Sequence, residues 1–174
     1  IKNVVLDDIK AGRITLIFRR WKRPGVKAGG TQNIADVCKK LNCKMTYIST
    51  DYVFDGQGTE PWQPDCKDYK PLNVYGQTKL DGELSVSSTL DKYFIVRIAW
   101  VFGKNGKNFI KTMLNVAKTH DKLTVVSDQI GTPTYTYDLA RLLVDMIETQ
   151  RAYEVNSKMI SATDEMMKNA AQTL

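Results

Sequence analysis

The chain has 174 residues, of which 43% are apolar and 25% are charged, and its formal net charge is +6. This length and apolar content predict a globular fold with a buried core. The sequence lacks the long apolar run of a membrane span, the even set of cysteines of a disulfide framework and the His/Cys spacing of a metal site. With no visible signal peptide, these features predict a cytoplasmic protein that binds no metal.

The positive charge is concentrated near the beginning of the chain. Residues 1–30 contain eight Lys or Arg and two Asp, whereas the remaining residues contain 17 of each sign. The run from Arg19 to Arg23 combines cations with Trp21, which is typical of nucleic-acid-binding patches, although a solvated strand end gives the same pattern. We expect at most weak, salt-sensitive binding, so nucleic acid is not the expected main partner.

Hydrophobic periodicity predicts alternating strands and helices. Alternating apolar residues indicate a strand, and apolar residues at i, i+3, i+4 and i+7 indicate a helix. In chain order, the sequence predicts a strand over residues 13–20, a helix over 31–41, a strand over 44–49, a polar loop over 55–69, a helix over 73–88, a strand over 93–98, a helix over 108–119, a strand over 123–126 and a helix over 136–148. Because no Pro or Gly follows Thr136, the last helix can continue into the tail. The alternation predicts an α/β fold with a doubly wound parallel sheet and a C-terminal helix.

A tyrosine and a lysine four residues apart carry the predicted chemistry. Tyr75 and Lys79 lie one turn apart on a predicted helix, and Thr50 follows a predicted strand. A phenol donates its proton well when a nearby ammonium pulls its pKa below about 10. This arrangement suits hydride transfer to a ketone, with Tyr75 as general acid and Thr50 holding the carbonyl oxygen. The alternative interpretation is an amphipathic helix with an inward aromatic residue and a solvated lysine.

The sequence segments around these residues resemble those of a known family. They are Tyr47–Gly56, Pro71–Lys79, Arg97–Gly103 and Asp128–Thr134. Over about residues 26–147 the chain resembles the dTDP-4-dehydrorhamnose reductases, which are extended short-chain dehydrogenase/reductases with a Rossmann-like fold. The resemblance implies a catalytic triad of Thr50, Tyr75 and Lys79, cofactor contacts from Tyr75 and Lys79, and sugar-nucleotide contacts from Thr50, Asp51 and Trp100.

The resemblance implies reduction of the 4-keto group of dTDP-4-dehydro-L-rhamnose by NADPH (or NADH). Tyr75 would donate the proton, while Lys79 would lower the pKa of Tyr75 and hold the nicotinamide ribose. The sequence departs from the family in two places. It contains no GxxGxxG turn for the cofactor pyrophosphate, which predicts an incomplete fold and weak cofactor binding, and Ile98-Ala99 replaces a usual Thr-Ser pair beside Trp100.

Two other side chains have open interpretations. Arg97 lies inside an apolar strand pattern, where it fits either a phosphate ligand or a member of a structural ion pair. Trp62 lies in the polar loop, and we expect it to fix that loop.

The two ends resemble other proteins. Residues 1–25 loosely resemble ASCH-type domains, and residues 149–174 resemble the C-terminal helix of flagellar rod and hook proteins. The sequence therefore predicts a basic segment (1–25), a reductase-like core (26–148) and a helical tail (149–174), as in a chimera. The tail has one apolar stripe that includes Val155, Met159, Ala162 and Met166. This stripe packs either on the chain's own core or on other helices. The alternatives to a working enzyme are an inactive assembly protein that forms a homo-oligomer through the tail, and a nucleic-acid binder that uses Arg19–Arg23.

Overall fold

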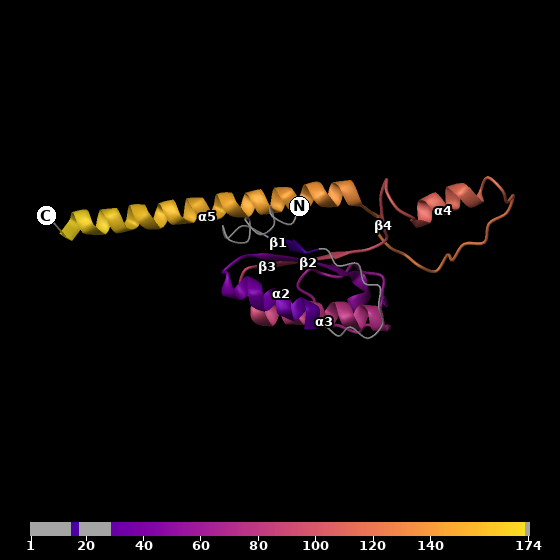
Figure 1. Cartoon of the computed structure of the whole chain (residues 1–174), viewed down its shortest axis with the longest axis horizontal. Coiled ribbons are helices and arrows are strands. Elements are labelled where there is room, and N and C mark those ends of the chain that lie inside the picture. The colour runs from indigo at the N-terminus through magenta and orange to yellow at the C-terminus, as the bar shows by residue number, and fades with distance from the viewer. Residues whose placement is uncertain (1–14, 18–28, 173–174) are drawn as a thin grey trace. The chain divides into compact units, whose positions relative to one another are not determined.

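The computed structural model describes residues 15–17 and 29–172 (Figure 1). Contacts divide the chain into two compact units, Ile1–Trp100 (unit 1) and Val101–Leu174 (unit 2). Among the residues described, no helix has the length and apolar character needed to cross a membrane. The basic run from Arg19 to Arg23, and most of the predicted segment 1–25, lie outside the described residues.

Unit 1 contains a three-stranded parallel sheet with two helices along one face (Figure 1). The elements are β1 (Thr15–Ile17), α2 (Gly29–Lys40), β2 (Met45–Thr50), the 3-10 helix η1 (Asp51–Val53), α3 (Val74–Thr89) and β3 (Tyr93–Ile98). The strand order is β1-β2-β3, and β2 pairs with β3 from Met45↔Tyr93 to Thr50↔Ile98. Parallel neighbours need a crossover connection, and α3 provides the one between β2 and β3.

Two apolar clusters hold unit 1 together. The larger lies between α2, β2 and α3, and it consists of Ala35, Cys38, Cys43, Met45, Val86 and Leu90. The smaller joins Val53, Phe54 and Leu80, with Cys66 and Tyr69 packed against them. All three cysteines are free thiols, and burial raises the pKa of Cys38 to about 12, so this thiol stays protonated.

Unit 2 consists of a short parallel strand pair and two helices. Strands β4 (Val101–Phe102) and β5 (Thr134–Tyr135) pair with each other, and α4 (Phe109–Val116) lies between them in the sequence. Helix α5 (Thr136–Gln172) continues without a break for 37 residues. The prediction that the last helix continues into the tail is therefore confirmed. Val155, Met159 and Met166 of the predicted stripe are exposed on α5.

The sequence prediction is wrong in one element of unit 2. Residues 123–126 form no strand, and the side chains of Leu123, Val125 and Val126 are exposed. A strand needs a neighbour to pair with, and in this unit β4 pairs with β5 instead. The predicted helix over residues 108–119 is shorter, because α4 ends at Val116. The α/β class, the parallel sheet and the C-terminal helix are confirmed.

Candidate active site

Thr50 lies at the carboxyl end of β2, the central strand of the sheet. Its side chain is buried, with 5% of the residue exposed. The Thr50 hydroxyl donates to the Asp51 carboxylate at 2.9 Å and accepts from the Tyr52 backbone N–H at 3.3 Å. Because Thr50 pairs with Ile98, the ends of β2 and β3 coincide, and Trp100 follows two residues later. This is the sheet edge where α/β proteins bind their ligands.

Tyr75 reaches this edge because the first turn of α3 packs tightly on η1. The Asn73 side chain caps α3 by accepting from the Gly76 N–H at 2.7 Å. A Cβ atom added at Gly76 would lie 2.1 Å from the Tyr52 carbonyl oxygen, so only glycine permits this approach. The rings of Tyr52 and Tyr75 meet edge to face, with 6.0 Å between their centroids. The sequence motif therefore needs its glycine for packing as well as its tyrosine for chemistry.

The pKa of Tyr75 is raised, whereas its spacing from Lys79 along the helix predicts a lowered pKa. Burial is the largest cause, and the nearby Asp51 and Tyr52 act in the same direction. The Thr50 side chain acts in the opposite direction. Burial disfavours the charged phenolate, an effect that spacing along the helix does not reveal. Tyr75 is thus held as a protonated phenol, the form that a general acid needs.

Lys79 points from α3 toward β2. Its ammonium donates to the Ile48 carbonyl at 2.7 Å and lies over the Tyr47 ring, 5.2 Å from the centroid. Burial lowers the pKa of Lys79, and the negative charge of Glu83 acts in the opposite direction. Lys79 thus reaches the same strand that carries Thr50, and the structure brings Thr50, Tyr75 and Lys79 to one region of unit 1.

Trp100 has a strained backbone. Its φ angle is +46°, in the left-handed region that bulky side chains rarely occupy. Such a conformation costs on the order of 1–3 kcal/mol and is found preferentially at functional sites. Trp100 follows the end of β3, and 47% of the residue is exposed. No feature of the sequence predicts this strain.

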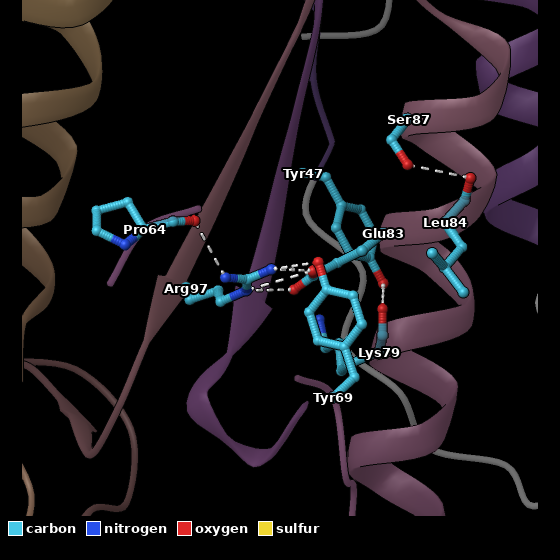
Figure 2. Close-up of polar contacts among 8 residues, drawn as sticks. All are labelled: Tyr47, Pro64, Tyr69, Lys79, Glu83, Leu84, Ser87 and Arg97. Atoms are coloured by element: carbon cyan, nitrogen blue, oxygen red, sulfur yellow. Dashed lines mark hydrogen bonds and ion pairs between the residues drawn. The ribbon is translucent and has the colours of Figure 1, made fainter. Parts of the chain in front are cut away.

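Arg97 belongs to a structural ion pair. Its guanidinium donates to both oxygens of the Glu83 carboxylate, with the shortest distance 2.7 Å, and also to the Tyr69 hydroxyl at 3.1 Å (Figure 2). This settles the alternatives for Arg97 in favour of the ion pair. Sequence reasoning missed Glu83, although its position four residues after Lys79 is a signal that could have identified it.

Trp62 fixes the loop, as the sequence predicts. Its ring stacks on Phe54 with 4.4 Å between centroids and an interplanar angle of 7°. The Arg97 guanidinium also lies over Phe54, 5.1 Å from the ring centroid. Loop residues 55–70 are therefore tied to the sheet through aromatic and cationic contacts.

The donor set fits the nicotinamide end of a dinucleotide cofactor. Tyr75 offers a phenol and Lys79 an ammonium near the end of one strand, and both can donate to ribose hydroxyls. In residues 15–17 and 29–172, no cluster of three or more His, Cys, Asp or Glu side chains is arranged to hold a metal ion.

Known proteins are similar to this chain in sequence and in fold. Residues 20–165 match the family described as RmlD substrate binding domain. A dTDP-4-dehydrorhamnose reductase from Aggregatibacter actinomycetemcomitans is 42% identical over 123 residues, which are 71% of this chain and 42% of that protein. The spore coat polysaccharide biosynthesis protein SpsK from Bacillus subtilis is 44% identical over 107 residues, 62% of this chain and 38% of that protein.

A solved dTDP-4-dehydrorhamnose reductase in complex with NADP, from Bacillus anthracis, has a TM-score of 0.73 and 33% identity. The match covers 84% of this chain and 57% of that one. The class that the fold defines is a Rossmann-like α/β protein. The chain belongs to the RmlD substrate binding domain family.

The chain spans about two fifths of the length of these curated relatives, 38% of one and 42% of the other. The predicted resemblance to dTDP-4-dehydrorhamnose reductases is confirmed. The family match also includes residues 149–165 of the predicted tail. The three-part division of the chain, and the resemblance of its ends to other proteins, stay predictions.

Proposed function

We propose that this chain carries the catalytic residues of an NADPH-dependent dTDP-4-dehydrorhamnose reductase. The reaction reduces the 4-keto group of dTDP-4-dehydro-L-rhamnose to the alcohol of dTDP-L-rhamnose. The observation that carries the proposal is the packing of α3 against the end of the central strand. The Tyr75 ring contacts Tyr52, whose backbone N–H donates to Thr50, and the Lys79 ammonium donates to the Ile48 carbonyl two residues before Thr50. The relatives named as reductases of this substrate class support the choice of reaction.

Tyr75 donates the proton in this proposal. Burial keeps its phenol protonated, so the proton is available when negative charge develops on the ketone oxygen. Thr50 hydrogen-bonds the same oxygen. Its single hydroxyl proton is directed at Asp51 in the free protein, so Thr50 must turn from Asp51 to the substrate as the ketone binds. Asp51 therefore has two roles in this proposal: it positions Thr50, and it contacts the sugar nucleotide.

Lys79 holds the ribose of the nicotinamide cofactor together with Tyr75. To do so its ammonium exchanges the Ile48 carbonyl for ribose hydroxyls. When bound, the reduced nicotinamide supplies the hydride for the carbonyl carbon. The sequence contains no GxxGxxG turn, so we expect this chain to bind NADPH in the high-micromolar range or more weakly.

Trp100 offers an aromatic surface to the sugar nucleotide. Aromatic rings contribute large contact areas with few rotatable bonds. The strained φ angle of Trp100 supports a functional rather than a packing role, because strain of this kind lowers stability and is found preferentially at functional sites.

The exposed stripe on α5 supports a second proposal, that the chain forms a homo-oligomer through this helix. Val155, Met159 and Met166 leave more than half of their surface exposed. A long helix needs a packing surface to persist in water, and a second copy of α5 provides one.

The free cysteines and the sugar-nucleotide chemistry support a cytoplasmic location.

The proposed reaction is tested by identifying its product. The chain is incubated with millimolar NADPH and dTDP-4-dehydro-L-rhamnose, and the sugar nucleotide is analysed by mass spectrometry and NMR. We expect a product heavier by two hydrogen atoms, with a new hydroxyl at C4. A folded chain that binds NADPH but leaves the ketone unchanged contradicts the proposed reaction.

A further inference from the structure

A buried carboxylate lies on α3 beside the proposed catalytic lysine. Glu83 follows Lys79 by four residues and is only 2% exposed. Side chains at this spacing share a helix face, and a lysine and a glutamate there commonly pair. Here each has another partner: Glu83 accepts from Arg97 of β3, and Lys79 donates to Ile48 of β2.

The contacts of Arg97 show how the carboxylate is held. Its Nη2 and Nε atoms lie 2.7 and 3.0 Å from the two Glu83 oxygens, so the guanidinium engages both sides of the carboxylate. Figure 2 shows the guanidinium between Glu83 on one side and the Pro64 carbonyl on the other, with Tyr69 beside it. Hydrogen bonding to Glu83 raises the pKa of Arg97, which stays charged. A planar, permanently charged guanidinium suits such a two-point contact.

We infer that Arg97 is a positioning residue that acts on Lys79 by occupying the Glu83 carboxylate. With Glu83 neutralised by Arg97, Lys79 is left to point toward the end of β2, where Tyr75 and Thr50 lie. Without Arg97 the buried carboxylate would have no cation facing it from β3, and Lys79 would turn to pair with it. The inference rests on the proposed function only for its effect on turnover, because the effect on Lys79 itself is independent of activity.

The groups around the Lys79 ammonium support this arrangement. Burial lowers the pKa of Lys79, and the negative charge of Glu83, one helical turn away on α3, acts in the opposite direction. Tyr47 on β2 faces the ammonium with its ring, and burial raises the pKa of Tyr47 to about 12, so this phenol stays neutral. Glu83 is therefore the anion whose neutralisation decides where Lys79 points.

The test measures the reactivity of each lysine amine in the whole chain, using a trace amine-reactive reagent and mass spectrometry. In Arg97→Met we expect Lys79 to react about tenfold more slowly, because pairing with Glu83 raises its pKa by about one unit. The double variant Arg97→Met with Glu83→Gln removes the carboxylate's charge and should restore the wild-type reactivity. Lys118 of unit 2 serves as the internal control, and Arg141→Met, which changes an exposed arginine of α5, is the matched variant.

Turnover gives the second measurement. We expect kcat of Arg97→Met to fall by about 10²-fold, as misplacing a catalytic group by about 1 Å does, with partial recovery in the double variant. If Arg97→Met fails to fold, Arg97→Lys is used instead, because it keeps a cation opposite Glu83. The reactivity of Lys79 should then stay within about threefold of wild type, which corresponds to a change of about half a unit in its pKa. Unchanged Lys79 reactivity in folded Arg97→Met, or a double variant no better than the single one, would overturn the inference. An inactive wild type with the expected labelling would refute the proposed reaction and leave the inference standing.

Discussion

Unit 1 and unit 2 differ in how their apolar side chains are used. In unit 1 two buried clusters join helices to the sheet, and the buried Glu83 carboxylate is paired with Arg97. In unit 2 Leu143 is the single buried residue among residues 101–168, and many large apolar side chains are exposed. The contrast teaches that buried contacts specify the structure of unit 1, whereas unit 2 leaves most of its large apolar side chains uncovered.

The largest expected effect tests the close packing of unit 1. Gly76→Ala would place a Cβ atom 2.1 Å from a backbone oxygen that cannot move away easily. We expect this change to lower the free energy of unfolding by about 3 kcal/mol or more, at the upper end for overpacking. Denaturant unfolding followed by tryptophan fluorescence measures it, because Trp21, Trp62 and Trp100 all belong to unit 1.

Gly29→Ala is the matched control for this substitution. Gly29 begins α2, and a Cβ atom added there meets nothing within 4 Å. We expect the free energy of unfolding to change by less than about 0.5 kcal/mol. Equal effects of the two glycine substitutions would contradict the account of α3 docking.

A smaller effect compares helix caps in the two units. Asn73 caps α3 in unit 1, and Asn108 caps α4 in unit 2 by accepting from the Lys111 N–H at 3.0 Å. We expect Asn73→Ala to lower the stability of unit 1 by about 1 kcal/mol, the usual value of such a cap. Asn108→Ala should leave the fluorescence-detected transition unchanged. A shift of this transition by Asn108→Ala would show that the two units unfold together.

The smallest effect on unit 1 is expected from deleting residues 149–174. The midpoint of the fluorescence-detected transition should stay within experimental error. Light scattering should show a lower mass, because the exposed stripe of α5 that supports the homo-oligomer is removed. An unchanged monomeric mass together with a less stable unit 1 would instead mean that the tail packs on its own core.

Local sequence patterns predicted most of unit 1. The features that could not be predicted depend on contacts between residues far apart in the sequence. Helices α2 and α3 and strands β2 and β3 follow from periodicity and from turn and cap residues that lie within each segment. The strand predicted at residues 123–126 failed because pairing depends on a partner elsewhere in the chain. The motif identified Thr50, Tyr75 and Lys79 as candidates. The pairing of Glu83 with Arg97 and the strain at Trp100 depend on the folded arrangement. The pKa of Tyr75 was expected in the wrong direction because helix spacing carries no information on burial.

The most direct test of the central claim is the turnover of Tyr75→Phe. This substitution removes the phenolic hydroxyl and keeps the ring that contacts Tyr52. We expect kcat to fall by about 10²-fold or more while the unfolding transition stays in place. Tyr137→Phe, at an exposed position of α5, is the matched control and should keep wild-type turnover. Because burial raises the pKa of Tyr75 above its usual value, wild-type turnover should also not decline through loss of this proton below about pH 10. Near-normal turnover in Tyr75→Phe would contradict the account, because Tyr75 would then not be the proton donor.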